Sequence, residues 1–231
     1  MTSDTAPRVR NRRGEGARLR ADLVRAAGRL LAEGGAPEHV SLRQVAEAVG
    51  VTAPSIYRHF PNKEALLLAV VAEQFEGLQR VLAEALDRGG DDPFAAMREA
   101  GRAYVAMGRA RPAHYEVLFG PIGGAILGLT GEEGMATGPG EFGPGDLGQG
   151  AFMMLVGLVE RALAAGPGGA RFDPFVVAVE TWAFVHGLVD LVTAHAGFPW
   201  PSVDSVIDGW VDLLEQAVRG LPAAGPVDAA G

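Results

Sequence analysis

The sequence predicts an all-α protein, in which an N-terminal helix-turn-helix domain of three helices precedes a larger C-terminal helical domain. Two observations support this fold class. Apolar residues recur three and four positions apart in successive segments, and capping residues, prolines or glycine clusters stand at the ends of those segments. With 231 residues, 48% of them hydrophobic, the chain has enough apolar surface for the core of one or two domains.

Composition excludes several classes of protein. The chain has no cysteine, which rules out disulfides, thiolate metal sites and a cysteine nucleophile. No uncharged apolar stretch of about 18 residues has the flanks of a membrane span, and the arginine-rich N-terminus lacks an apolar signal core. We therefore expect a cytoplasmic protein.

The net charge of −8 conceals a division along the chain. Residues 1–63 hold eleven Arg or Lys and six Asp or Glu, a net charge of +5, whereas residues 64–231 carry a net charge of −13. Only the first segment can attract a polyanion such as DNA. Six arginines lie between positions 8 and 20. We predict that residues 1–17, which hold four of them, form a disordered basic arm. This arm is either a solvated tail or a segment that contacts phosphates or a minor groove.

Residues 41–60 have the pattern of two short helices around a tight turn. Ser41 and Gln44 form a capping-box pattern that begins the first helix. Gly50 ends it, because a residue without Cβ enters the left-handed region at little cost. Thr52 is the expected N-cap of the second helix, which we predict to continue to Phe60, where Pro61 stops it.

The second of these helices has one apolar side and one polar side. Ile56 and Phe60 lie four residues apart and are expected to point into the core. The residues left for the outer surface are Pro54, Ser55, Tyr57, Arg58 and His59. Most of these side chains are polar or aromatic, and they suit contacts with phosphates and base edges better than a place in the core.

Asn62 is the expected N-cap of a long helix over residues 63–86. Lys63 lies in the first turn of that helix, where a positive charge opposes the helix dipole. We interpret this unfavourable position as a sign that the ammonium group meets a phosphate.

Helical patterns continue toward the C-terminus, interrupted by one glycine-rich segment. Between residues 120 and 150, twelve of 31 residues are Gly and three are Pro, which predicts a mobile loop or, alternatively, a lid formed by residues 122–129. The helices predicted after residue 86 cover residues 93–109, 112–119, 146–165, 173–195 and 202–220.

Residues 18–68 resemble the N-terminal DNA-binding domain of the TetR family of transcriptional regulators. The match includes an apolar helix, Leu23 to Glu33, closed by two glycines, and the string IYRHFPNKEALL that begins at Ile56. The string TWAFVHGLVDL, which begins at Thr181, resembles the C-terminal WHG subgroup of that family. The resemblance implies a homodimeric regulator, in most relatives a repressor, with a DNA-binding domain over 18–64, a regulatory and dimerisation domain over 65–221 and a flexible tail over 222–231.

The resemblance also implies DNA contacts at individual positions. Tyr57 has the alternative of packing against the first helix, and Arg58 that of a surface ion pair with little energetic value. Phosphate contacts are expected from Ser41, Tyr57 and Lys63, and contacts to base edges or sugars from Arg43, Ala53, Pro54, Ser55, Arg58 and His59.

The last two predicted helices are apolar around most of their circumference, so each needs cover on more than one side. A twofold-related copy would provide this cover in an intermolecular four-helix bundle, and burial within the same chain is the alternative. The predicted dimer contacts are Val185, Val189, Val192, Ile207, Trp210 and Leu214.

A small, largely apolar effector that releases the protein from DNA is implied by family behaviour. Core packing is the alternative role for each pocket candidate, and no cofactor is expected. The pocket candidates are Tyr104, Met107, Phe119, Phe152, Met153 and Trp182.

Two other functions stay open from the sequence: a DNA-binding regulator without an effector, and a helical enzyme or metal-binding protein. The five histidines lack HExxH spacing, and neither G-x-S-x-G nor a phosphate-binding glycine loop is present, so we expect no enzyme. His186, Asp190 and His195 are conceivable metal ligands, although a helical histidine beside apolar neighbours is usually a hydrogen-bonded packing residue.

Overall fold

A computed structural model describes residues 15–34, 37–120 and 148–220 of the chain. Within these ranges the chain forms helices and turns and contains no strand, which confirms the all-α prediction. Most of the predicted basic arm, nearly all of the glycine-rich segment, the whole of its possible lid and the whole of the predicted tail lie outside the described residues.

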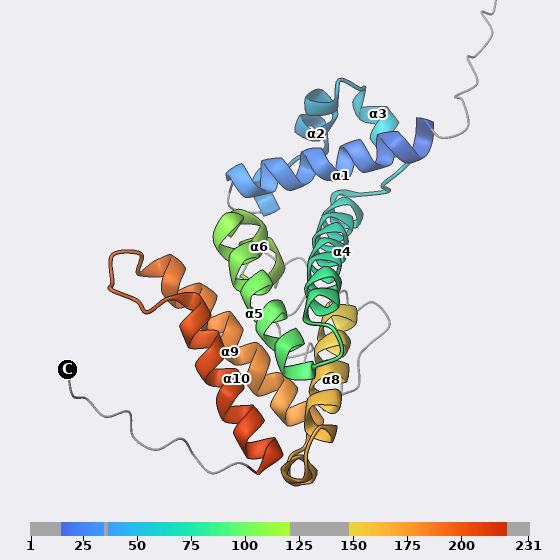
Figure 1. The fold of residues 1–231 in the computed structure, drawn as a ribbon. Coiled ribbons are helices and arrows are strands. Elements are labelled where there is room, and N and C mark those ends of the chain that lie inside the picture. The colour runs from blue at the N-terminus through green and yellow to red at the C-terminus, as the bar shows by residue number, and fades with distance from the viewer. Residues whose placement is uncertain (1–14, 35–36, 121–147, 221–231) are drawn as a thin grey trace, which may run out of the picture.

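Three helices form an N-terminal head, shown in blue at the top of Figure 1. Helix α4 (Lys63–Gly89) leaves this head and runs into a larger helical body. The head itself consists of α1 (Glu15–Gly34), the short 3-10 helix η1 (Pro37–His39), α2 (Leu42–Val49) and α3 (Ala53–Ile56).

Helix α5 (Pro93–Ala110) is the central element of the body and packs against α4 and every other body helix of the described residues except η3. Figure 1 shows α9 and α10 along one edge of the molecule, and the stacked rings of Phe184 and Trp210, 5.1 Å apart between centroids, connect the two helices. The other body elements are α6 (Pro112–Phe119), α8 (Gln149–Ala164), η3 (Pro167–Arg171), α9 (Pro174–Ala194) and α10 (Val203–Arg219).

Side-chain caps determine where several of these helices begin. Asn62 Oδ1 accepts a hydrogen bond from the Ala65 N–H at 2.8 Å, and Asp173 Oδ1 accepts one from the Phe175 N–H at 2.8 Å. Ser202 Oγ accepts the Ser205 N–H at 3.1 Å. Each cap satisfies a backbone donor that the first helical turn leaves unpaired. The helix starts predicted at these three residues are therefore confirmed.

Helix α3 is shorter than the sequence predicted. It ends at Ile56, and residues 57–59 form a turn in which the His59 and Phe60 N–H groups both donate to the Ile56 carbonyl, at 2.8 and 2.9 Å. The prediction of a helix to Phe60 was wrong for residues 57–60, and Pro61 accounts only for Phe60, because proline disfavours the helical conformation in the one residue before it.

Helix α4 shares its apolar side between head and body. Leu66 and Val70 are fully buried, and α1 packs across this part of the helix. Further along, Phe75 and Leu78 are buried in the body, where Phe75 meets the ring of Phe119 edge to face at 5.8 Å. These side chains belong to one hydrophobic cluster that continues from the head into the body.

Helix α10 is attached to α5 by a ladder of ion pairs. Arg98 reaches Asp212 and Glu215, the latter at 3.1 Å, and Arg102 lies 3.4 Å from Asp204. All of these side chains are partly exposed, so each pair is worth little alone. Because the carboxylates recur along one side of α10, the ladder fixes which side of that helix faces α5.

Helices α5 and α9 approach closely at Gly108. A Cβ atom there would lie 2.6 Å from Cγ1 of Val189 and 3.2 Å from the Tyr115 ring, and both of these neighbours are buried. Val189 is β-branched and therefore has few alternative rotamers. The close approach thus depends on the missing side chain.

We predict that Gly108→Ala lowers the free energy of unfolding by about 1–3 kcal/mol, the usual cost of overpacking a core. Gly77→Ala in α4 is the matched control, because the nearest atom to its Cβ position is 3.9 Å away and alanine favours a helix by about 0.5–1 kcal/mol over glycine. Urea unfolding followed by circular dichroism measures both. Equal effects of the two substitutions would contradict the close packing.

Candidate nucleic-acid interface

The N-terminal end of α2 lies on the exposed face of the head. Ser41 Oγ accepts from the Gln44 N–H at 3.2 Å, and the Ser41 N–H donates to Gln44 Oε1 at 2.9 Å, so the predicted capping box is confirmed. The Ser41 hydroxyl also donates to Gln44 Oε1 at 2.7 Å. A phosphate contact from this hydroxyl therefore has to replace that bond. Arg43, two residues further, is exposed.

Gly50 sets the angle between α2 and α3. Its φ of 76° lies in the left-handed region, as predicted, and the Val51 N–H donates back to the Ala46 carbonyl at 2.9 Å. Thr52 occupies the predicted N-cap position, but its hydroxyl lies 3.0 Å from the Ser55 hydroxyl instead of capping a backbone N–H.

Burial of two side chains orients the whole of α3 and the turn after it. Ile56 and Phe60 have exposed fractions of 0% and 2%, as predicted. Tyr57, between them, is 59% exposed, so it does not pack against the first helix. Arg58 is also exposed, and its Nη2 donates only a long 3.4 Å bond to Ser55 Oγ, without a carboxylate partner among the described residues. Both side chains are free to meet a ligand.

The remaining predicted contact residues differ in exposure. Pro54 is exposed, whereas Ala53, Ser55 and Lys63 are half-buried. His59 is half-buried as well, and its Cε1 lies 3.9 Å from the Cβ position of Gly16 in α1. This residue therefore faces the start of α1 rather than standing fully on the outer surface.

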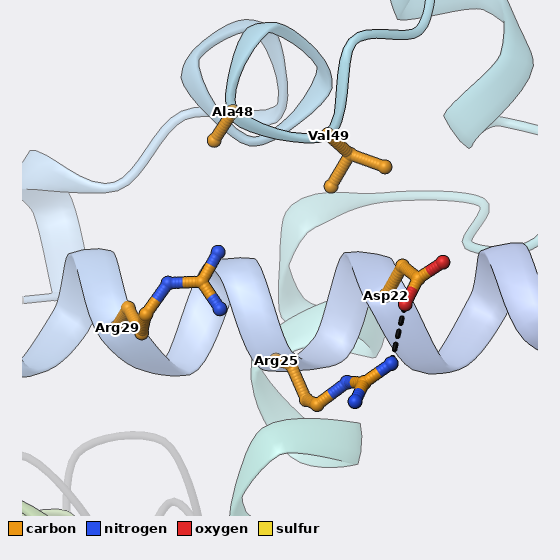
Figure 2. A pocket seen from close by; sticks show the side chains of 5 residues that line it. All are labelled: Asp22, Arg25, Arg29, Ala48 and Val49. Carbon is orange, nitrogen blue, oxygen red and sulfur yellow. Dashed lines mark hydrogen bonds and ion pairs between the residues drawn. The ribbon is translucent and has the colours of Figure 1, made fainter.

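A shallow hollow of about 320 Å³ lies between α1 and α2 (Figure 2). Its sides are Asp22, Arg25 and Arg29 of α1 and Ala48 and Val49 of α2. Arg25 pairs with Asp22, while the guanidinium of Arg29 extends toward α2 without a carboxylate partner among the described residues. The sequence prediction did not include this basic feature, although the sequence places Arg25 and Arg29 four residues apart, on one side of a helix.

The body contains a cluster of aromatic rings that unites four of the six pocket candidates. Trp182 lies 6.3 Å from Phe119 and 5.9 Å from Phe152 between ring centroids, and Tyr104 lies 6.0 Å from Phe119. Of the two remaining candidates, Met107 is half-buried on α5 and Met153 is 46% exposed on α8.

Tyr115 and His186 also belong to this cluster and were missed as pocket candidates. The hydroxyl oxygens of Tyr104 and Tyr115 lie 2.9 and 2.7 Å from Nδ1 of His186. Burial lowers the pKa of His186, although Asp190 opposes this shift, and burial raises the pKa of both tyrosines. All three groups are therefore neutral near pH 7. His186 was visible only as part of the TWAFVHG string, and Tyr115 gave no separate signal.

The three conceivable metal ligands, His186, Asp190 and His195, do not form a metal site in the structure. Nδ1 of His186 faces two tyrosines, and Asp190 and His195 are exposed. Within the described ranges, no three His, Asp or Glu side chains gather in the arrangement of a metal site.

Three of the six predicted dimer contacts are buried within the single chain. Val185, Val189 and Ile207 are 9%, 1% and 1% exposed, and Ile207 packs on α5 at Gly101. A second copy cannot reach these side chains, so this part of the prediction was wrong. The other three, Val192, Trp210 and Leu214, are half-buried. The exposed large apolar residues of α9 and α10 are Val176, Val179, Trp182, Leu191 and Leu213.

Comparison with known proteins agrees with this geometry. Residues 23–70 match the model of bacterial regulatory proteins of the tetR family. A 114-residue stretch is 34% identical to the HTH-type transcriptional regulator TcmR of Streptomyces glaucescens, and covers 49% of this chain and 48% of that protein. The chain thus spans about half the length of this curated relative.

Solved structures share the fold over most of the chain. A TetR family transcription regulator from Marinobacter aquaeolei VT8 has a TM-score of 0.63 at 17% identity, covering 89% of this chain and 98% of that one. The transcriptional regulator FadR of Bacillus subtilis, in complex with stearoyl-CoA, has a TM-score of 0.63 at 14% identity, covering 85% and 98%. Residues 23–70 are therefore similar to the tetR family of bacterial regulatory proteins, and most of the chain shares the fold of these solved regulators.

Proposed function

We propose that this protein is a cytoplasmic, DNA-binding transcriptional repressor that binds an inverted-repeat operator as a homodimer and is released by a small, largely apolar effector. Residues 18–64 contact the operator, and residues 65–221 bind the effector and the second copy. The carrying observation is the outward face of the turn that follows α3, where Tyr57 is 59% exposed and Arg58 has no carboxylate partner among the described residues. This face lies inside the segment that matches the tetR family model.

A single head of this size contacts only a few base pairs, so a second copy is needed for a specific site. Helix α9 supports a dimer because its 18-residue window of highest hydropathy averages 1.7, yet only 33% of that window is buried. By length and composition alone such a helix can also span a membrane. Packing of α9 against α5 and α8, and exposed Glu180 and Asp190 on it, favour a protein partner.

An effector is favoured over regulation without one by the composition of the body. Three neutral polar groups, Tyr104, Tyr115 and His186, meet within a cluster of aromatic rings. A purely structural core is usually built from apolar groups, and polar groups that converge in an aromatic setting are typical of ligand sites. The related Bacillus subtilis fold with bound stearoyl-CoA supports a ligand in this architecture.

Selection from a pool of random duplexes tests the proposed function directly. The full chain should enrich an inverted repeat whose half-sites are about one duplex turn, 34–36 Å, or a multiple of it apart. Recovery of unrelated sequences, or of none above a bead control, would refute a sequence-specific regulator.

Lys63→Ala should weaken binding to all duplexes by a similar factor and lower the slope of log affinity against log salt by about one per lysine–phosphate contact. Arg80→Ala is the matched control, since it removes a charge from the same helix about 25 Å further along. Titrations at several salt concentrations measure both slopes. Equal slopes for the two variants would remove Lys63 from the interface.

Arg58 is expected to recognise a base edge, because its guanidinium can form two parallel hydrogen bonds with a guanine. Arg58→Lys keeps the charge but loses this geometry, so it should retain binding to random DNA while the preference at one operator position falls about tenfold or more. Competition with operators substituted at single positions measures this preference. A uniform loss at all positions would indicate a phosphate contact instead.

Leu213 is the most exposed large apolar residue of the described chain, at 68%. Leu213→Glu should convert the dimer into a monomer, because the substitution would bury a negative charge in the interface. Leu68→Glu on α4, where the leucine is 41% exposed, is the matched control. Sedimentation velocity gives the mass of each variant. An unchanged dimer in the first variant would exclude this face as the contact.

A further inference from the structure

The N-terminal end of α1 lies beside α3 and the turn that follows it (Figure 1). Two contacts, four residues apart on α1, place it there. A Cβ atom at Gly16 would lie 3.9 Å from Cε1 of His59, and the guanidinium carbon of Arg20 lies 4.9 Å from the centre of the Phe60 ring. Residues four apart share one side of a helix. This side of α1 therefore borders the surface formed by residues 57–60.

Arg20 keeps its charge available for a further partner. The residue is exposed, and among the described residues its guanidinium contacts the Phe60 ring and no carboxylate. An aromatic ring attracts a cation without neutralising it, and it leaves the N–H donors of the guanidinium for an oxygen acceptor. Arg25, the next arginine on α1, differs because it pairs with Asp22. Arg20 thus presents a positive charge that is held in place but not consumed.

The ring below Arg20 lies between two predicted phosphate contacts in the sequence. Tyr57, three residues before Phe60, is 59% exposed, and Lys63 follows three residues after it. Phe60 itself is 2% exposed, so its ring is fixed in the core of the head. A duplex that meets Tyr57 and Lys63 also brings its backbone oxygens close to the cation on this ring.

A phosphate is the expected acceptor rather than a base edge. Base edges are reached from the reading helix itself, whereas the elements that flank this helix contact the backbone. Arg20 belongs to the flanking elements because it stands on α1. A guanidinium also matches the paired oxygens of a phosphate, to which it can donate two parallel hydrogen bonds.

We propose that Arg20 contacts a DNA backbone phosphate and that the Phe60 ring positions its guanidinium for this contact. The inference rests on the proposed function for the presence of a duplex. It adds α1 to the surface that meets the duplex, outside the segment 41–63 that holds all of the predicted contacts.

Arg20→Met keeps a side chain that covers the Phe60 ring but removes the charge and the donors. It should weaken binding to selected and random duplexes alike by about tenfold, and lower the slope of log affinity against log salt by about one. Arg20→Lys should restore the slope. Arg80→Met is the matched control, because Arg80 is exposed on α4 and also has no carboxylate partner among the described residues. Equal slopes for Arg20→Met and Arg80→Met would overturn the proposal.

The positioning role of Phe60 is tested by combining two substitutions. Phe60→Leu keeps an apolar side chain in the core but removes the ring, so it should weaken duplex binding by about two- to fivefold, the worth of an exposed cation–π contact. Added to Arg20→Met, it should have no further effect, because no cation is left to position. Circular dichroism checks that each variant folds. Additive effects of the two substitutions would assign Phe60 a structural role only.

Chemical modification of the unchanged protein gives an independent readout. Phenylglyoxal modifies accessible guanidinium groups, and peptide mass spectrometry locates the products. A saturating random duplex should protect Arg20 and leave Arg80 reactive. Equal modification of Arg20 with and without the duplex would overturn the proposal even where the duplex selection succeeds. Conversely, a failed selection with retained binding to random duplexes would refute the specific operator and leave this contact standing.

Discussion

Burial of one side of α4 is the constraint that holds the two halves of the molecule together. Leu66 and Val70 lie against the head, and Phe75 and Leu78 lie in the body. The helix has 27 residues and is about 40 Å long without a break. Full burial of each such side chain is worth roughly 1.5–3 kcal/mol. A rotation of α4 that exposed either end would therefore be costly, so any change in the body that turns this helix also moves the head.

Local chemistry explains which parts of the fold were predictable. Caps at Ser41, Asn62 and Asp173 depend on a side chain and a backbone N–H two or three residues away, so the sequence alone contained them. The orientation of α3 and of the turn after it was predictable because Ile56 and Phe60 are the large apolar residues of this segment. The end of α3 was missed because the helical spacing of apolar residues continues to Phe60, although the chain forms a turn directly after Ile56.

The direction of α9 and the make-up of the aromatic cluster were not predictable in the same way. Helix α9 is apolar on nearly every side, so its spacing cannot distinguish Val189, which is buried, from Leu191, which is exposed. Tyr104 and Tyr115 are 82 and 71 residues from His186 in the chain. Only the packing of α5 and α6 with α9 brings them together, and no local pattern records that packing. Four rings were predicted from composition, but the polar centre between them was not.

Helix α6 links the aromatic cluster to the head. This eight-residue helix contributes Tyr115 and Phe119 to the cluster, and it also packs against α1 and α4. Protein cores are densely packed, so a ring displaced from His186 has to move its helix rather than fill a void. On the proposed function, a ligand at His186 weakens DNA binding only if it binds the DNA-free arrangement of α6 more tightly than the DNA-bound one. The short path from Phe119 through α6 to α1 makes this requirement attainable by a small displacement, because one rigid helix touches both the ligand site and the head.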